Sequence, residues 1–254
     1  AADFGGGSGR IIAGTISNGK LHIEEIHRFT NRLVQLGKHI YWDFPCLFQD
    51  MKEGMRLAAK QGLKINGIGV DTWGVDFGLI DRNGNLLGNP VSYRDKRTVG
   101  IPEKVFDIIS KSEHYRRTGI QAMPINTLFQ LYSMLLEDNP QLTIADRLLF
   151  MPDLFNYFLT GIAANEYSIS STSELLNANT HTWDTDLLSQ LKIPQHLFGE
   201  IRQPGTILGK LKKEIAKETG LDEIDVITVG SHDTASAIAA IPASGENYAF
   251  LSSG

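Results

Sequence analysis

The sequence predicts an α/β fold built around a mixed β-sheet, and three observations lead to this class. Short β-branched runs recur in separate parts of the 254-residue chain. Longer stretches between them carry apolar side chains at helical spacing. A tight turn that joins two of the early runs predicts antiparallel neighbours. Strands and helices mixed in this way are typical of a sheet covered by helices.

The first thirty residues predict three strands joined by tight turns. Residues 1–3 look like the end of a strand that leads into a glycine-rich turn, and the β-branched run at residues 11–16 predicts the next strand. Asn18-Gly19 is a strong signal for a two-residue hairpin turn. Apolar residues at positions 21, 23 and 26 then continue on a returning strand.

The middle of the chain predicts a helix, two strands and then a largely helical region. Residues 45–61 carry apolar side chains at helical spacing, residues 65–70 read as a buried strand, and residues 75–80 follow as another strand. Helical spacing returns between about residues 100 and 160. The predicted helices in the rest of the chain are residues 126–137, 153–159, 184–191 and 207–219.

The last part of the chain predicts a short strand, a polar turn and a helix of small residues. The strand covers residues 226–229 and the helix residues 234–240. Pro242 to Gly245 look like a boundary, and a new apolar run follows them. We therefore expect one domain over residues 1–241, and a linker with the start of a second domain over residues 242–254.

The composition argues against several classes of protein. Lys and Arg number 24 against 29 Asp and Glu, so the net charge is −5, and duplex nucleic acid is a poor partner for such a chain. The only cysteine, Cys46, allows no intrachain disulfide and favours a reducing compartment. The longest uncharged run, residues 118–136, contains Gln, Asn and Pro, so we predict no membrane span. No signal-peptide pattern occurs, and we expect a cytoplasmic protein.

A glycine-rich turn at residues 3–10, Asp-Phe-Gly-Gly-Gly-Ser-Gly-Arg, is the first candidate site. Consecutive glycines let several backbone N–H groups face one point, which suits phosphate oxygens. Ser8 could add a hydroxyl group and Arg10 a positive charge. The P-loop pattern is absent, and the dinucleotide fingerprint fails because a strand rather than a helix follows. Two interpretations remain open: a phosphate clamp between two strands, or a flexible hairpin turn.

A second candidate, Asp-Thr-Trp-Gly-Val-Asp at residues 71–76, directly follows the predicted buried strand. The ends of such strands are a usual place for sites in α/β sheets. Trp73 could pack on the apolar face of a sugar, and Gly74 would let a ligand approach the backbone. The alternative is a bulge between two strands, with Trp73 in the core.

A third candidate, Ser-His-Asp-Thr at residues 231–234, lies between a strand and a helix. A carboxylate at Asp233 could accept a proton from a substrate hydroxyl group. The helix dipole would stabilise its ionised form. The alternative is structural, since Asp is a favoured N-cap residue. Adjacent Ser, His and Asp residues do not form a protease triad, because neighbours in sequence cannot adopt that geometry.

Together these motifs resemble the FGGY family of carbohydrate kinases, and the resemblance covers essentially the whole chain. The most specific strings are Asp-Thr-Trp-Gly-Val-Asp-Phe at residues 71–77 and Ser-His-Asp-Thr-Ala-Ser at residues 231–236. The glycine turn is shared more widely, with actin-like ATPases. Further matching segments are residues 25–29, 67–70, 93–98, 119–121, 126–128, 151–153, 159–161 and 166–168.

The resemblance implies two actin-like (ribonuclease H-like) domains around a deep cleft in which ATP and a sugar meet. It also implies a role for each matching position. Asp233 would be the catalytic base, and Asp3 would help to hold Mg²⁺. The remaining implied contacts are Gly6, Gly7, Ser8, Gly9 and Arg10 with the ATP phosphates, and Gly74, His232, Asp233 and Thr234 with the sugar.

The stretch after Pro124 bears on the sugar. Many family members carry Lys and Trp there, whereas residues 125–130 of this chain are Ile-Asn-Thr-Leu-Phe-Gln, which is similar to the members that act on L-rhamnulose. The resemblance therefore implies ATP-dependent phosphorylation of L-rhamnulose to L-rhamnulose 1-phosphate. The alternatives are another ketose kinase, of fuculose or xylulose type, and a non-catalytic actin-like module that binds nucleotide or a partner.

Overall fold

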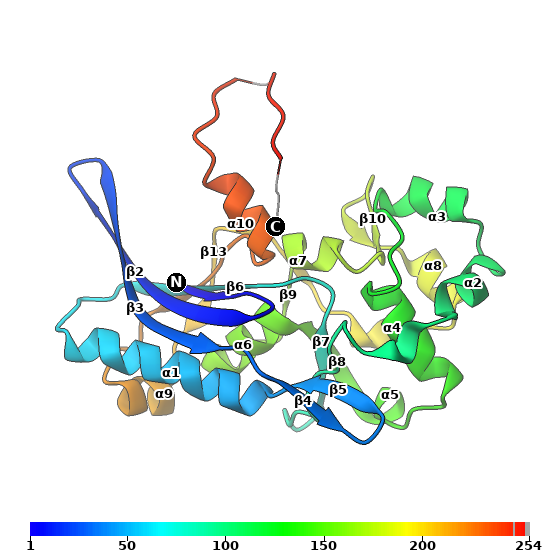
Figure 1. Ribbon diagram of the computed structural model, residues 1–254, viewed down its shortest axis with the longest axis horizontal. Helices are drawn as coiled ribbons and strands as arrows, with labels where there is room; N and C mark the ends of the chain where they lie inside the picture. Colours follow the sequence, from blue (N-terminus) through cyan, green and yellow to red (C-terminus); the bar gives the residue numbers. More distant parts are fainter. Residues whose placement is uncertain (246, 252–254) are drawn as a thin grey trace.

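A six-stranded mixed sheet forms one half of the molecule (Figure 1), in the computed structural model that describes residues 1–245 and 247–251. Its strand order is β13-β14-β6-β1-β2-β3. The central strands β14, β6 and β1 run parallel, and the outer strands pair antiparallel. The strands are β1 (Ala2–Phe4), β2 (Ser8–Ser17), β3 (Lys20–Thr30), β6 (Gly67–Thr72), β13 (Thr206–Lys210) and β14 (Asp225–Thr228).

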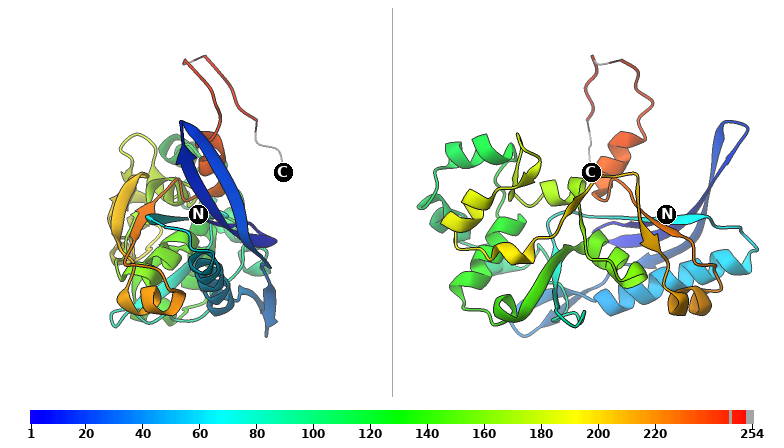
Figure 2. Two further views of the ribbon diagram at one scale, coloured as in Figure 1. Left: turned by 90° about the vertical axis from the view of Figure 1, so that its left-hand side faces the viewer. Right: turned by 180° about the vertical axis from the view of Figure 1, so that it is seen from behind.

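Three helices cover one face of this sheet (Figure 2): α1 (Phe44–Lys60), α6 (Met151–Thr160) and α9 (Lys213–Thr219). Phe4 of β1 stacks on Phe155 of α6, with ring centroids 4.2 Å apart. Phe44 of α1 packs against the same Phe155 at 4.9 Å. These aromatic side chains belong to one buried apolar core that joins the central strands to their helices.

A second core lies beside the sheet, around a two-stranded antiparallel pair, β7 (Phe77–Asp81) and β8 (Ala145–Phe150). The helices around it are α2 (Ile101–Phe106), α3 (Lys111–Thr118), α4 (Thr127–Leu136), α5 (Gln141–Ile144) and α8 (Thr185–Gln190). The remaining elements are β4 (Leu33–Leu36), β5 (His39–Trp42), β9 (Asn165–Glu166), α7 (Tyr167–Ser171), β10 (Leu176–Asn177), β11 (Thr182–Trp183), β12 (Ile201–Arg202) and α10 (Asp233–Ala239), with single 3₁₀ turns at Lys96–Thr98 and Gln195–Leu197.

The predicted α/β class with a mixed sheet is confirmed, but two helical predictions are wrong. Residues 207–219 do not form one helix, because residues 206–210 pair antiparallel with β14 and only residues 213–219 are helical. Gly209 allows this strand to pack closely, since a Cβ atom there would lie 2.7 Å from Ile162 Cδ1. Residues 145–150, within the region expected to be helical, pair with β7 as β8.

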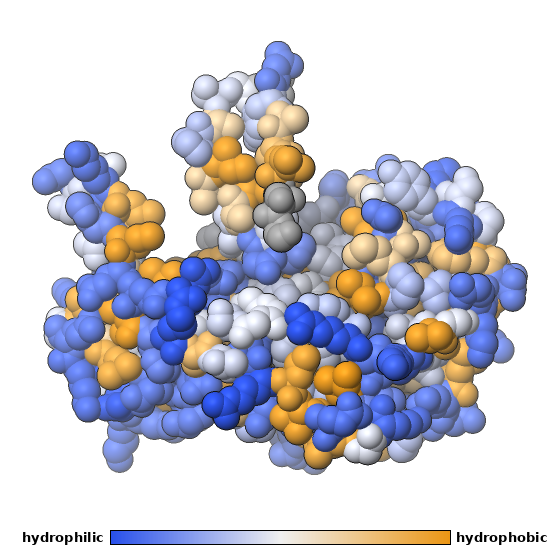
Figure 3. Space-filling view, in the orientation of Figure 1, coloured by the Kyte–Doolittle hydropathy of each residue, from blue (hydrophilic) through white to orange (hydrophobic). Residues whose placement is uncertain are grey.

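Exposed apolar side chains gather on two projecting segments (Figure 3). Ile16, Leu21 and Ile23 are exposed near the tip of the β2–β3 hairpin. The C-terminal segment from about residue 242 leaves the body of the molecule, and Tyr248 to Leu251 form no strand. The boundary near residue 241 stays a prediction, and Glu246 and residues 252–254 lie outside the described residues. No helix in the described part of the chain is both long enough and apolar enough to cross a membrane.

We predict that Gly54→Ala destabilises the domain, although Ala favours helices more than Gly. Gly54 lies in α1, and a Cβ atom there would fall 2.2 Å from Ile11 Cγ1 on β2. Overpacking of this kind costs about 1–3 kcal/mol, against a gain in helix propensity of about 1 kcal/mol. Urea unfolding should therefore show a net loss of stability. Gln49→Ala on the exposed side of α1 should change it by less than about 0.5 kcal/mol. Equal stability of the two variants would contradict the close helix–sheet contact.

Candidate functional site

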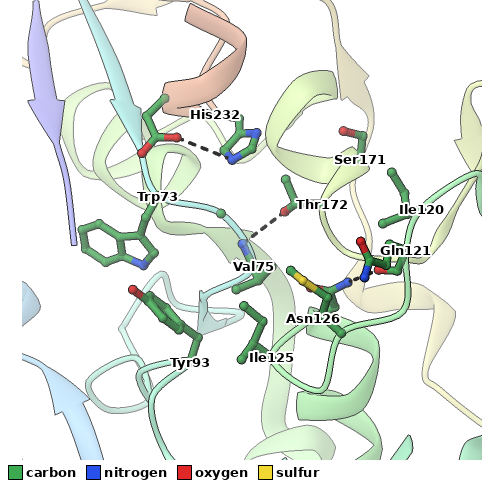
Figure 4. A pocket seen from close by; sticks show the side chains of 13 residues that line it. Trp73, Val75, Tyr93, Ile120, Gln121, Ile125, Asn126, Ser171, Thr172 and His232 are labelled. Atoms are coloured by element: carbon green, nitrogen blue, oxygen red, sulfur yellow. Dashed lines mark hydrogen bonds and ion pairs between the residues drawn. The ribbon is translucent and has the colours of Figure 1, made fainter. Parts of the chain in front are cut away.

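A cavity of about 510 Å³ lies between the two cores (Figure 4). Its walls come from five parts of the chain: residues 73–75, Tyr93, the loop at residues 120–126, the end of α7 with Thr172, and the start of α10. Side chains from all five parts converge on the space. The cavity therefore depends on the tertiary fold and not on one local motif.

Two of the predicted motifs meet at this cavity because their strands are parallel neighbours. Strands β6 and β14 run side by side, so residues 73–75 and residues 231–233 emerge at the same edge of the sheet. The backbone N–H of Thr72 donates to the carbonyl oxygen of Ser231 at 2.9 Å. A Cβ atom on Gly74 would lie 3.3 Å from His232 Nε2. A larger residue at this position would therefore crowd Thr172 and His232.

A buried carboxylate, Asp76, organises the wall around Trp73. Its Oδ2 accepts hydrogen bonds from Trp42 Nε1 at 2.6 Å, from Trp73 Nε1 at 3.0 Å and from the backbone N–H of Tyr93 at 3.0 Å. Its Oδ1 accepts one from Gln130 Nε2 at 3.0 Å. Burial raises the pKa of Asp76 to about 6, against the opposing effect of these hydrogen bonds. Asp76 thus fixes two cavity residues at once, Trp73 and Tyr93.

Trp73 is both a core residue and a cavity residue. Its side chain is buried and packs on Trp42, with ring centroids 4.2 Å apart, which confirms the predicted core position. It also lines the cavity. The backbone beside Trp73 is irregular: Val75 adopts a φ of 69°, which β-branched residues rarely take. Its N–H donates to Thr172 Oγ1 at 3.1 Å, which joins this wall to the end of α7.

Asp233 stands at the first residue of α10, at the edge of the cavity. The N-cap position belongs to His232, so the alternative that Asp233 is the N-cap is wrong. Asp233 Oδ1 accepts from the N–H of Thr234 at 2.6 Å and from its hydroxyl at 3.1 Å. His232 Nε2 lies 3.5 Å from the same oxygen. Burial lowers the pKa of His232, although the Asp233 carboxylate opposes this, so the neutral imidazole is favoured.

A second buried carboxylate, Glu166, holds the turn that carries Asp233. Glu166 Oε2 accepts hydrogen bonds from the N–H of Ser231 at 3.2 Å and from Ser168 Oγ at 2.6 Å. Ser168 Oγ in turn accepts from the N–H of His232 at 3.2 Å. The two residues before Asp233 are therefore both fixed through one carboxylate, which is fully buried. The same side chain caps α7, so that helix and the turn are held together.

The loop at residues 120–126 is tied to the segment that follows α7 by a third buried acid, Glu174. Its Oε1 accepts from the N–H of Met123 at 3.1 Å and from the side-chain amide of Asn126. Burial raises the pKa of Glu174 to about 7. His114 Nε2 lies 3.4 Å from its other oxygen. The resemblance relates residues 125–130 to the sugar, and Ile125 and Asn126 line this wall of the cavity. Glu174 and His114, which lie behind it, match no short sequence motif.

The glycine turn lies next to the cavity, and only some of its backbone polar groups form hydrogen bonds within the protein. Asn31 fixes two of its carbonyl oxygens, those of Gly5 and Gly7. Within the described residues, the N–H groups of Gly6 and Gly7 have no protein partner. A Cβ atom on Gly7 would meet nothing within 4 Å, so the turn is open there. Open N–H groups favour the phosphate clamp over a simple hairpin turn.

Not all of the residues predicted to bind phosphate are free to do so, because some of them already contact other parts of the protein. Gly9 packs against Phe29, where a Cβ atom would lie 2.3 Å from the ring. Arg10 pairs with Asp3, its partner across the β1–β2 ladder. Ser8 begins strand β2. The cation expected for phosphate is therefore already paired with a carboxylate.

Three carboxylates lie near one another beside the turn. Asp3 and Asp71 are direct neighbours on the parallel strands β1 and β6. Burial, together with the negative charges of Asp3 and Asp233, raises the pKa of Asp71 to about 7. Among the described residues no group of three His, Cys, Asp or Glu could hold a metal ion unaided. This excess of negative charge fits a magnesium ion that keeps most of its water and phosphate ligands.

Comparison with known proteins places the chain among sugar kinases. The model of the N-terminal domain of the FGGY family of carbohydrate kinases matches residues 1–240. The chain is 47% identical to a protein named rhamnulokinase from Bacteroides thetaiotaomicron, over the whole chain and 52% of that relative. It is 43% identical to a rhamnulokinase from Oceanobacillus iheyensis, over the whole chain and 54% of the relative. The chain thus spans about half the length of the curated relatives it matches.

Solved structures share the fold at lower identity. A gluconate kinase from Lactobacillus acidophilus superposes with a TM-score of 0.79 at 20% identity, over 91% of this chain and 47% of that one. A xylulose kinase from Rhodospirillum rubrum gives a TM-score of 0.78 at 16% identity, over 90% of this chain and 48% of that one. At these identities the likeness concerns the fold alone.

We predict that Asp76→Asn changes how stability depends on pH. The pKa of Asp76 is raised to about 6 in the folded domain, so the folded state holds its proton more tightly than the unfolded state. The stabilisation of the protonated form is therefore lost as pH rises from about 4 through 6. Asn cannot ionise. The stability of the wild type relative to Asp76→Asn should fall by about 3 kcal/mol over this range, at 1.36 kcal/mol per pKa unit.

Urea unfolding at several pH values between 4 and 7 provides the measurement. Asp71 and Glu174 also have raised pKa values, but they titrate in both proteins and cancel in the difference. Parallel stability curves for the two proteins would mean that the pKa of Asp76 is the same in the folded and unfolded states, and would contradict the raised pKa.

Proposed function

The chain belongs to the FGGY family of carbohydrate kinases, and from this premise we propose that it is the sugar-binding domain of a kinase for L-rhamnulose. The γ-phosphoryl group of ATP is transferred to the C1 oxygen of the sugar, which gives L-rhamnulose 1-phosphate and ADP. The relatives of 37–47% identity, all named rhamnulokinase, support this substrate.

One observation carries the proposal: Asp233 lies at the edge of a cavity of sugar size, on a turn held by buried hydrogen bonds. Phosphoryl transfer needs alignment and charge neutralisation more than covalent help from the protein. A carboxylate fixed at the cavity edge supplies the alignment. As general base, Asp233 accepts the proton of the C1 hydroxyl while that oxygen attacks the γ-phosphorus.

The sugar is held by the residues around Asp233. Gly74 leaves its backbone open toward the cavity, and His232 offers a neutral imidazole for hydrogen bonds. Thr234 holds Asp233 through its own N–H and hydroxyl group. Trp73 gives an apolar surface for the carbon face of the sugar ring or chain.

The glycine turn holds the ATP phosphates in this proposal. The unpartnered N–H groups of Gly6 and Gly7 suit phosphate oxygens, and Ser8 and Gly9 complete the turn. Asp3, with Asp71 beside it, would hold Mg²⁺ through water, and the ion neutralises phosphate charge when bound. Arg10 keeps Asp3 in place.

The family resemblance also bears on the rest of the protein. We propose that residues 242–254 lead into a second actin-like domain, which supplies the adenine pocket and closes over the sugar. ATP as a substrate and a single thiol favour the cytoplasm. The proposal includes no nucleic-acid and no membrane partner.

Two alternatives differ in what they would bind. A fuculose or xylulose kinase would keep Asp233 but prefer another ketose. The solved xylulose kinases are only 12–19% identical and support the fold alone. A non-catalytic actin-like module would bind nucleotide without transfer. The intact set of Asp3, Asp233 and the glycine turn argues against it.

Sugar-dependent ADP release by the full-length protein distinguishes these possibilities. We expect kcat/KM with L-rhamnulose to exceed that with L-fuculose or D-xylulose by at least about tenfold, since differential binding of one or two hydroxyl groups is worth this much. A preference for either of the other ketoses would replace the proposed substrate. If the protein binds nucleotide but releases no ADP with any of the three sugars, the result would support the non-catalytic module.

Asp233→Asn tests the mechanism within the same protein. Asn keeps an oxygen that can accept from Thr234 and has almost the same size, so folding and sugar binding should survive. It cannot take up the hydroxyl proton, and kcat should fall by at least about a hundredfold. The measurements are kcat, the sugar Kd and the melting temperature. A stable, sugar-binding variant with nearly normal turnover would remove Asp233 from the mechanism.

A further inference from the structure

The phosphate turn lacks a free cation of its own. Arg10 is the only basic residue in the turn, and its guanidinium forms an ion pair with Asp3. Their positions face each other across the β1–β2 ladder, so the pair is part of the sheet. A transferring phosphoryl group carries charge on three equatorial oxygens and needs a positive group beside it. A cation from another part of the chain that reaches the turn would add to the charge that Mg²⁺ supplies when bound.

Arg94 lies beside the turn although it is more than eighty residues away in sequence. A Cβ atom on Gly6 would lie 3.4 Å from Arg94 Nη2 and 3.2 Å from the hydroxyl oxygen of Tyr93. The guanidinium therefore lies on the side of Gly6 where a side chain would stand, and the N–H group of Gly6 has no protein partner among the described residues. The arginine also keeps its own access to solvent, since its side chain is exposed.

Tyr93 fixes Arg94 between the turn and the cavity. The guanidinium carbon lies 5.4 Å from the centroid of the Tyr93 ring, and Arg94 Nε donates to the Tyr93 hydroxyl at 3.3 Å. Tyr93 lines the sugar cavity, and its backbone N–H is held by Asp76. Arg94 thus stands where a phosphoryl group would pass from the turn to the sugar.

The charge of Arg94 is not used by a protein carboxylate. Within the described residues, no Asp or Glu forms an ion pair with it. Its neighbours in the same segment differ. Asp95 accepts hydrogen bonds from the N–H groups of Ile40 and Arg97, and Arg97 donates to Gln130. Of this charged segment, Arg94 is the arginine left for a ligand.

We propose that Arg94 contacts the γ-phosphoryl group during its transfer from ATP to the sugar. The inference rests on the proposed kinase function. The sugar O1–phosphorus bond forms as the bond from phosphorus to the β,γ-bridging oxygen breaks, the hydroxyl proton goes to Asp233, and ADP leaves with the bond's electron pair. Arg94 makes and breaks no bond; its fork of N–H donors binds the phosphoryl oxygens as their charge shifts.

The test uses Arg94→Gln and Arg94→Lys in the full-length protein, with Lys96→Gln as the matched control. Lys96 is an exposed cation two residues further on, outside the site. We expect Arg94→Gln to lower kcat at least about tenfold. It should also weaken binding of Mg-ATP relative to Mg-ADP, because only ATP carries the γ-phosphate. Arg94→Lys should fall between the wild type and Arg94→Gln, since it keeps the charge and loses the fork. Lys96→Gln should change neither quantity.

Three outcomes decide the inference. If Arg94→Gln has the same kcat and the same preference for ATP over ADP as Lys96→Gln, the inference is overturned. A melting temperature that falls together with activity would assign Arg94 a structural role and would also overturn it. If the wild type binds ATP but does not phosphorylate L-rhamnulose, the proposed substrate fails, while loss of the ATP-over-ADP preference in Arg94→Gln still supports the contact with the γ-phosphate.

Discussion

The buried carboxylate of Asp76 is the constraint on which the rest of the site depends. Burying an ionisable group costs free energy unless polar partners compensate for lost water. Here the compensation comes from two indole N–H groups, one backbone N–H and one amide, which belong to separate segments. Because all of them must meet at one point, β5, the end of β6, the Tyr93 segment and α4 are locked together where the two cores join.

This constraint explains why the cavity and the phosphate turn lie side by side. Trp73, which donates to Asp76 through its indole, forms a wall of the cavity, and the hydroxyl group of Tyr93, whose backbone Asp76 also holds, lies beside Gly6. A second buried carboxylate, Glu166, fixes the turn that carries Asp233 through hydrogen bonds, as Asp76 fixes Trp73. The reacting groups thus lie at the ends of strands and the starts of helices, and hydrogen bonds to buried acids fix the positions of these segments.

The sequence predicts local secondary structure well, but it does not predict which distant segments come into contact. The Asn18-Gly19 hairpin, the long helix near residues 45–61 and the strand before Asp71 follow from period and turn chemistry. The predicted helix at residues 207–219 is wrong over residues 207–210, because their apolar spacing suits a helix as well as a strand and the pairing with β14 decides between them. Arg10 shows the same limit at the site, since its pairing with Asp3 depends on strand register. Sequence reasoning does not single out Arg94 as a site residue, because nothing local reveals that its guanidinium lies beside Gly6.

The most direct test of the account is a crystal structure of the full-length protein with L-rhamnulose, Mg²⁺ and a non-hydrolysable ATP analogue. The account predicts the sugar in the cavity between Trp73 and His232, with its C1 oxygen within about 2.6–3.2 Å of the Asp233 carboxylate. The terminal phosphate should lie against the N–H groups of Gly6 and Gly7. Sugar bound elsewhere, or a C1 oxygen turned away from Asp233 and the glycine turn, would contradict it.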